Sequence, residues 1–182
     1  MHNSIGLIEL SSIAYGFFVA DTMMKAADVE LLLSRTICSG KYIILVGGDV
    51  GAVKTAVVEG RKAADFTLID DFIIPNVHEK VFPAIRGNVS VNVEEALGIL
   101  ESFSVSALIE GADAACKEAS VDLIEIRLAM ALGGKAFATM TGTVADVKAA
   151  IAAGAKQIAD KGLLVNKIVI PYPVKDIYKE II

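Results

Sequence analysis

The sequence is an internal duplication, and this feature constrains the fold more than any other. Residues 5–9 (Ile-Gly-Leu-Ile-Glu) match residues 97–101 (Leu-Gly-Ile-Leu-Glu), an offset of 92 within 182 residues. The same offset pairs Ser12/Ser104, Asp21/Asp113, Lys25/Lys117 and Arg35/Arg127. After position 40 the second copy has two extra residues, and the pairs continue as Lys41/Lys135, Gly48/Gly142 and Val53/Val147. Because an internal repeat indicates a repeated structural unit, we expect two similar domains, residues 4–90 and 95–182, joined by the polar residues 88–92.

Each copy has the same order of predicted elements. In the first copy these are a strand over residues 4–10, a helix over about 13–27, strands over 29–35 and 42–46, a helix over about 50–64 and a strand over 66–74. Ser11 or Ser12 is placed to cap the first helix, where Asp21 and Lys25 form an i,i+4 pair worth about 0.3–0.5 kcal/mol when solvent-exposed. Pro75 ends the last strand, and residues 77–85 predict a short helix. The order β-α-β-β-α-β predicts an α+β, ferredoxin-like fold with an antiparallel sheet and helices on one face.

Cys38 lies in a turn between two apolar, strand-like runs. The turn reads Thr36-Ile37-Cys38-Ser39-Gly40-Lys41, and a glycine-bearing break of this kind is typical of a hairpin. A cysteine on an exposed turn is often present for its chemistry, although a tolerated surface thiol explains it equally well. One thiolate cannot hold a metal centre, since zinc sites and iron–sulfur clusters need three or four ligands. If Cys38 is a ligand, symmetry-related copies must supply the others.

The composition indicates a globular chain with more apolar residues than its own cores require. Hydrophobic residues make up 54% of the chain and the mean hydropathy is +0.60, yet no apolar run approaches the roughly 18 residues of a membrane span. The N-terminus has no signal-peptide pattern. We therefore expect a cytoplasmic protein that uses no membrane and buries its apolar surplus in subunit contacts. The net charge of −5 and the lack of a basic run argue against nucleic acid as a partner.

Other motifs in the sequence favour structural roles over catalysis. Two distant cysteines and two histidines predict neither a disulfide framework nor a metal site within one chain. Residues 47–55 resemble a phosphate-binding loop but lack its Gly-Lys, so helix capping explains them better. Glu9 and Glu101 end equivalent strands, but no histidine, serine motif or second acid accompanies them, and we interpret both as structural. We expect no enzymatic activity.

The repeated motifs resemble a known family. The Gly-x-Ile/Leu-Glu strand, the Asp-x-x-x-Lys-x-Ala-x-Val helix end and the Gly-Asp-Val-x-x-Val-x-x-Ala segment resemble bacterial microcompartment shell domains. Two such domains in tandem resemble the shell proteins that form trimers with a hexagonal outline. More narrowly, residues 34–41 and 47–53, with residues 74–78 and 161–165, resemble the iron–sulfur shell proteins of propanediol-utilisation compartments. The resemblance covers nearly the whole chain.

This resemblance implies a homotrimer, a pseudohexamer of six domains, with one Cys38 per subunit at its central pore. Three Cys38 thiolates would bind one [4Fe–4S] cluster for electron transfer across the shell or for cluster delivery. The residues implied to line the pore are Thr36, Ile37, Ser39, Gly40, Leu132 and Gly133. Lys25 and Lys117 match the edge lysines that meet neighbouring subunit assemblies, here called tiles. The implied partners are other shell proteins and an encapsulated redox enzyme, and the implied location is a microcompartment shell in the cytoplasm.

Alternatives remain at this point. The same tile could carry a metabolite gate without a cluster, and Lys25 and Lys117 could be solvated lysines in helix-end ion pairs. A duplicated ferredoxin-like enzyme or small-ligand sensor would need convergent polar residues that neither copy supplies. Cys116, inside a predicted helix beside Lys117, is expected to pack rather than to bind metal.

Overall fold

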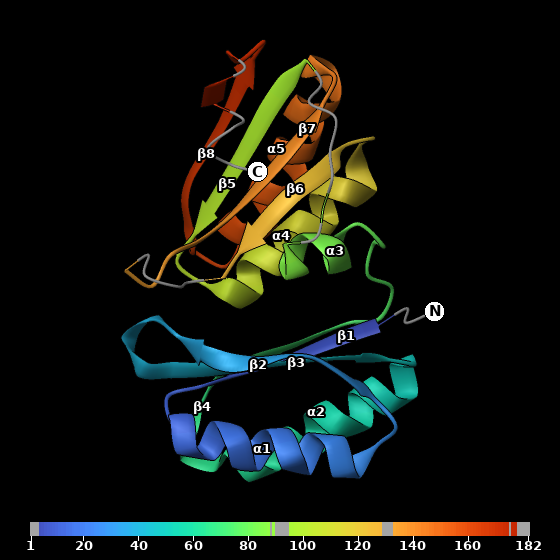
Figure 1. Cartoon of the computed structure of the whole chain (residues 1–182), viewed down its shortest axis with the longest axis vertical. Helices are drawn as coiled ribbons and strands as arrows, with labels where there is room; N and C mark the ends of the chain where they lie inside the picture. Colours follow the sequence, from blue (N-terminus) through green and yellow to red (C-terminus); the bar gives the residue numbers. More distant parts are fainter. Residues whose placement is uncertain (1–3, 88, 90–94, 129–132, 175, 178–182) are drawn as a thin grey trace. The chain divides into compact units, whose positions relative to one another are not determined.

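A computed structural model describes residues 4–87, 89, 95–128, 133–174 and 176–177 of the chain. The chain divides into two compact units, Met1–Val77 and His78–Ile182. Each unit contains a four-stranded antiparallel sheet with two helices on one face, as Figure 1 shows. The predicted β-α-β-β-α-β order is therefore confirmed in both copies.

The first unit places its core between the sheet and the helices. Its strands are β1 (Ser4–Leu10), β2 (Glu30–Ile37), β3 (Lys41–Gly48) and β4 (Leu68–Ile74), its helices are α1 (Ile13–Ala26) and α2 (Val50–Ala64), and short 3₁₀ turns cover Cys38–Gly40 and Asp65–Thr67. The strand order is β2-β3-β1-β4. Ile8, Ile44 and Val46 of the sheet pack with Met23 of α1 and Val53 of α2, all buried.

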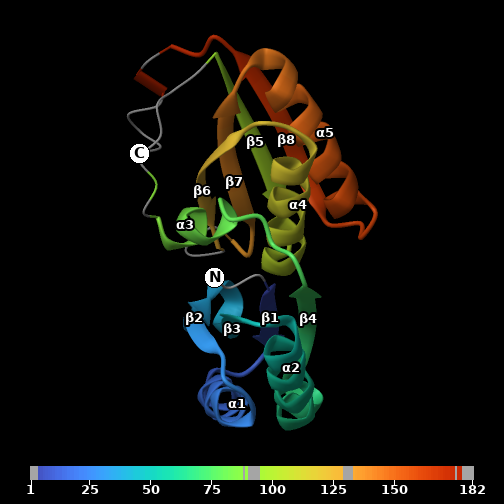
Figure 2. The same cartoon turned by 90° about the vertical axis from the view of Figure 1, so that its right-hand side faces the viewer.

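The second unit repeats this arrangement. It contains the strands β5 (Ala96–Ser102), β6 (Asp122–Arg127), β7 (Ala136–Gly142) and β8 (Leu164–Pro171), with the helices α4 (Val105–Glu118) and α5 (Val144–Ala159). The strand order β6-β7-β5-β8 is the same as that of the equivalent strands in the first sheet, and both helices again lie on one face (Figure 2). The predicted helix cap is present in both copies, because Ser12 Oγ accepts from Tyr15 N at 3.4 Å and Ser104 Oγ accepts from Ala107 N at 3.2 Å.

A repeated glycine lets a helix lie against the central strand of each sheet. A Cβ atom added at Gly6 would stand 2.4 Å from Cγ2 of Val57, and one at Gly98 would stand 2.7 Å from Cγ1 of Val147. Both distances are shorter than close-packed carbon atoms tolerate. The glycine of the Gly-x-Ile/Leu-Glu motif is therefore required for packing.

The short helix α3 (Val81–Arg86) packs against β6 and α4 of the second unit. Lys80, just before it, forms an ion pair with Asp122 at 2.7 Å and donates to the Val121 carbonyl at 2.8 Å. The backbone N–H of His78 donates to Asp113 Oδ1 at 2.7 Å. The compact units thus divide at Val77/His78, whereas the sequence pattern placed this helix at the end of a first domain over residues 4–90.

Candidate functional site

Cys38 begins the turn that joins β2 to β3. Two consecutive residues of this turn lie in the left-handed region, Ser39 with φ 66° and Gly40 with φ 73°. Ile37 pairs with Lys41 and closes the hairpin. The Cys38 side chain is half-buried, whereas Ser39 and Gly40 are exposed, and a Cβ atom at Gly40 would meet no heavy atom within 4 Å. The predicted turn between the two strands is therefore present, with Cys38 half-buried at its first position.

The second copy has a similar turn without a cysteine. Gly133 and Gly134 occupy the positions of Ser39 and Gly40, and both are left-handed, with φ 62° and φ 87°. The counterpart of Cys38 is Leu132, a predicted pore residue that lies outside the described residues. Two left-handed residues in succession are unusual, and only glycine adopts this conformation without steric cost. The shared backbone indicates that the turn shape belongs to the fold, whereas the thiol belongs to the first copy.

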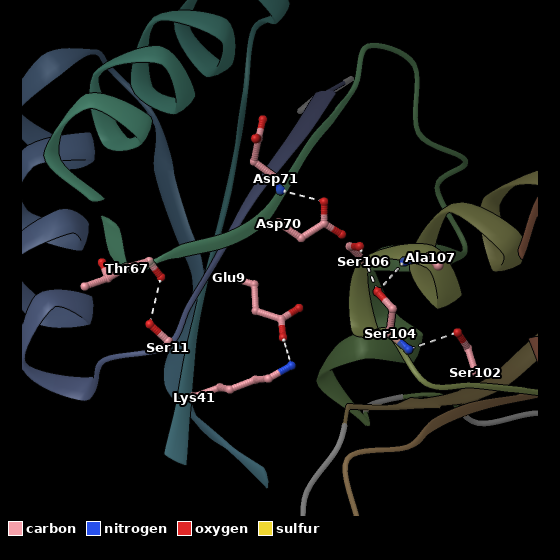
Figure 3. A network of polar contacts seen from close by, with 10 residues as sticks. All are labelled: Glu9, Ser11, Lys41, Thr67, Asp70, Asp71, Ser102, Ser104, Ser106 and Ala107. Carbon is pink, nitrogen blue, oxygen red and sulfur yellow. Dashed lines mark hydrogen bonds and ion pairs between the residues drawn. The ribbon is translucent and has the colours of Figure 1, made fainter. Parts of the chain in front are cut away.

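An ion pair stands at the base of each turn. Lys41 Nζ lies 2.8 Å from Glu9 Oε1, and the two side chains point toward one another in Figure 3. The side chain of Glu9 is only 4% exposed. Lys135 repeats the pair with Glu101 at 2.5 Å in the second unit. The sequence analysis identified both glutamates as structural but missed both lysine partners, although the Gly-Lys after each turn repeats and could have drawn attention to them.

The donor chemistry of Cys38 suits an iron–sulfur cluster, but one chain offers too few ligands. In the described parts of the chain, no group of three or more His, Cys, Asp or Glu side chains is gathered closely enough to hold a metal ion. A thiolate is the ligand that iron–sulfur clusters require. A cluster at Cys38 therefore fits only if several copies bring their turns together.

Cys116 differs from Cys38 in burial and in chemistry. Its side chain is 6% exposed within α4. The pKa of the Cys116 thiol is raised to about 12, chiefly by burial; the ammonium group of Lys80 opposes the shift, and the carboxylates of Asp113 and Asp122 add to it. Because the thiolate is the form that binds metal or reacts, Cys116 stays inert at neutral pH. Its environment agrees with a packing role.

The predicted edge lysines sit in the last turns of α1 and α4. Lys25 pairs with Asp21 at 2.6 Å and Lys117 pairs with Asp113 at 2.6 Å, so the predicted i,i+4 pair forms in both copies. The two pairs differ in exposure, because the side chain of Asp21 is 57% exposed and that of Asp113 is 8% exposed. Asp113 also accepts the His78 N–H. Lys117 is therefore held by a buried partner, whereas Lys25 forms an exposed pair.

The face of the second sheet that carries no helix contains a shallow pocket that sequence analysis missed. Its volume is about 260 Å³, and its lining residues are Ile99, Glu101, Phe137, Asn166, Lys167 and Ile168. Ile168 is 50% exposed. Beside the pocket, the Arg127 guanidinium stacks over the Phe137 ring at 5.3 Å and pairs with Glu125 at 2.8 Å. Its residues come from three strands, so no local motif could reveal it.

The fold and the repeated turn show that the protein consists of two copies of one α+β domain in tandem. The BMC domain model matches residues 4–77 and 96–173. The chain therefore belongs to the BMC domain family, the bacterial microcompartment shell domains that its motifs resemble. Among the helices of the described ranges, none combines the length and apolar character needed to cross a bilayer.

Individual shell proteins are similar to this chain over most or all of its length. The chain is 42% identical to the bacterial microcompartment shell protein PduT of Citrobacter freundii, over all of this chain and 99% of that protein. A microcompartment protein from Desulfitobacterium hafniense DCB superposes with a TM-score of 0.93 at 47% identity, covering 98% of this chain and 99% of the other. A fused permuted hexameric shell protein from the RMM microcompartment shares the fold, with a TM-score of 0.62 at 24% identity over 86% and 81% of the two chains.

Proposed function

We propose that this protein is a structural subunit of a bacterial microcompartment shell and that its homotrimer binds one [4Fe–4S] cluster at a central pore. Each subunit contributes the thiolate of Cys38, and the fourth iron has no cysteine ligand. The polypeptide itself catalyses no reaction. Its partners are other shell proteins and a redox enzyme inside the compartment. Full-length similarity to PduT and the family membership of both copies support the shell role.

Two exposed apolar faces support a homo-oligomer. On α1, Ile13 is 41% exposed and Phe17 is 65% exposed, although their counterparts in α4, Val105 and Ile109, are buried. On the second sheet, Ile168 is 50% exposed beside the pocket described above. Apolar faces of this kind usually bind another protein surface. Because the two faces differ, a contact between them would be heterologous, the type of contact that forms a ring when the rotation between subunits closes. The proposed ring has three subunits.

A threefold axis would turn one cysteine per chain into a set of three ligands. Iron–sulfur clusters take thiolate ligands, and Ser39 and Gly40, which follow Cys38, are small and exposed, so they add little bulk where three turns would meet. Their backbone N–H groups would be candidates to donate to sulfur and adjust the electronics of a bound cluster. The cluster, when bound, supplies one-electron transfer. The turns of the second copy, with Gly133 and Gly134, would alternate with the cysteine turns.

The observation that carries the proposal is the half-buried thiol on a left-handed turn. The direct test is anaerobic reconstitution of the wild type, followed by iron and sulfide analysis and visible absorption. We expect brown protein with four iron and four sulfide per trimer. Cys38→Ser should form colourless trimers of nearly unchanged stability, because Cys38 is not among the buried core residues and serine has almost the same size. Cys116→Ser is the matched control and should keep the cluster.

A metabolite gate is the alternative outcome of the same experiment. Wild-type trimers that bind no more iron and sulfide than Cys38→Ser trimers would refute the cluster. They would leave the pore as a passage for small molecules.

A further inference from the structure

Lys41 occupies a distinctive position relative to Cys38. It is the first residue of β3 after the turn, and it pairs with Ile37 to close the hairpin. Its ammonium group lies 2.8 Å from the Glu9 carboxylate on β1, the neighbouring strand. The base of the Cys38 turn is thereby tied to the centre of the sheet.

The burial of Glu9 makes this tie strong. Glu9 is 3% exposed, and a buried carboxylate without a counter-charge is costly. Among the ion pairs found in the described residues, Lys41 is the one that neutralises Glu9. A shift of Lys41 away from the sheet would leave the carboxylate buried and unpaired. The ion pair therefore resists movement of the strand end that carries the turn.

A second contact holds the other side of the same hairpin. Tyr42, the next residue of β3, shares a hydrogen bond of 2.9 Å between its hydroxyl and Ser34 Oγ on β2. Tyr42 is 3% exposed and packs in the core on the helix side of the sheet. Successive residues of β3 thus anchor both faces of the hairpin directly behind the exposed turn.

We propose that Lys41, held by Glu9, is a positioning residue that sets the direction of the Cys38 thiol. The inference rests on the proposed function, because direction matters where three thiols share one cluster. A site of this kind tolerates little displacement, since each sulfur must reach iron at a bond length near that of other metal–thiolate bonds, about 2.3 Å. The Glu9–Lys41 pair supplies the rigid support that the exposed turn lacks.

The duplication provides a matched control for this inference. Lys135 and Glu101 form the same ion pair behind the turn that has no cysteine. Lys41→Met and Lys135→Met therefore remove ion pairs at equivalent places in the fold, although the side chain of Glu9 is 4% exposed and that of Glu101 is 28% exposed. Lys41→Met should weaken the fold more, because it leaves the more buried carboxylate unpaired, and only Lys41→Met should change the behaviour of Cys38. Lys41→Arg keeps the charge and should restore wild-type behaviour.

The first measurement needs no cluster. Iron-free trimers carrying Cys116→Ser are treated with a short bismaleimide, which joins two thiols only when they lie close together. We expect efficient cross-links between Cys38 residues in wild-type, Lys135→Met and Lys41→Arg trimers, and a several-fold lower yield in Lys41→Met trimers. Equal yields in Lys41→Met and Lys135→Met trimers would overturn the positioning role.

The second measurement uses reconstituted trimers. Lys41→Met should lose its cluster in air several-fold faster than Lys135→Met. A loss rate equal to that of Lys135→Met would contradict the inference.

If Lys41→Met fails to fold, the double variant Glu9→Gln/Lys41→Met replaces it, since it leaves no buried charge. That variant should cross-link poorly and lose its cluster quickly. The cross-linking and reconstitution experiments distinguish a failure of the proposed function from a failure of this inference. Wild-type trimers that neither cross-link nor bind iron would refute the function, whereas wild-type trimers that do both, together with unaffected lysine variants, would refute only the role of Lys41.

Discussion

At the scale of single residues, the two cysteines differ in burial, and burial determines how easily a thiol forms the reactive thiolate. Cys38 is half-buried on an exposed turn, whereas Cys116 is 6% exposed inside α4. The pKa of the Cys116 thiol is raised to about 12, first because burial disfavours the thiolate. Of the two thiols, Cys116 is therefore the one whose burial suppresses the reactive thiolate.

The raised pKa of Cys116 predicts a specific pH dependence of stability. An unfolded chain ionises this thiol near its ordinary value of 9.0, whereas the folded chain holds the proton until about pH 12. Between these values the unfolded state binds fewer protons, so the free energy of unfolding falls as pH rises. The slope contributed by this group approaches about 1.4 kcal/mol per pH unit and is absent below pH 9.

Comparison with Cys116→Ala isolates this slope from other groups that titrate in alkali. Denaturant unfolding at several pH values from 8 to 10.5 should show wild-type stability falling more steeply than that of the variant. Parallel curves above pH 9 would mean that the Cys116 thiol ionises as easily in the folded protein as in the unfolded chain.

At the scale of elements, a helix lies directly against the central strand of each sheet because that strand contains a glycine. Val53 and Val57 of α2 approach Gly6, while Val147 and Ile151 of α5 approach Gly98. The same arrangement in both copies shows that this contact is a property of the domain. It is also the part of the fold least able to accept an added methyl group.

Gly6→Ala should therefore destabilise the protein by about 1–3 kcal/mol through overpacking. Its matched control is Gly51→Ala in α2, where an added Cβ atom would meet no heavy atom within 4 Å. That change should be neutral or stabilise by up to about 1 kcal/mol, since alanine favours helix more than glycine does. Both are measured by guanidinium unfolding at one protein concentration. A Gly6→Ala protein as stable as the wild type would show that α2 can move off the strand cheaply.

At the scale of the whole molecule, the exposed apolar surface suits a protein whose folding is completed by assembly. Phe17 and Phe18 of α1 and Ile168 of β8 are each at least 50% exposed. The apolar surplus of the composition is consistent with these surfaces. Their burial between subunits is the expected driving force of the trimer.

A charge on the exposed face of α1 should therefore dissociate the trimer. Phe17→Asp places a carboxylate where Phe17 is 65% exposed in the single chain, so the fold should survive while the subunit contact fails. We expect monomers at micromolar concentration by light scattering and a far-ultraviolet circular dichroism spectrum like that of the wild type. Ala152→Asp, at an exposed position of α5, is the control and should remain trimeric. Trimeric Phe17→Asp would place the subunit contact elsewhere.

The proposed role of Lys25 and Lys117 as edge lysines concerns the next level of assembly. Replacing both Lys25 and Lys117 with alanine should leave trimers intact and reduce their incorporation into shells, because lateral contacts between tiles are lost. Of the single variants, Lys25→Ala should have the larger effect, since Lys25 is 74% exposed and Lys117 is 41% exposed. Incorporation is measured by co-expression with other shell proteins and purification of the assembled particles, with Lys54→Ala in α2 as the control. Normal incorporation of the double variant would contradict the edge role and would favour the alternative that both lysines are solvated residues in helix-end ion pairs.

Much of this molecule could be predicted from local sequence signals. Repeats, apolar periodicity and turn residues predict the duplication and the order of elements. They also predict the helix caps at Ser12 and Ser104 and the turn that carries Cys38. Each of these depends on residues close together in the chain, where side-chain pattern and backbone preference act directly. The family resemblance rests on the same short motifs.

Other features depend on residues far apart in sequence and required the coordinates. The pairing of Glu9 with Lys41, the attachment of α3 to the second unit and the different burial of Asp21 and Asp113 arise from packing between elements. Equivalent residues in the two copies have the same local sequence pattern but different surroundings, and the pattern alone could not separate them. The physical reason is that burial and ion pairing depend on which surfaces meet, whereas periodicity and turn chemistry act within a few residues.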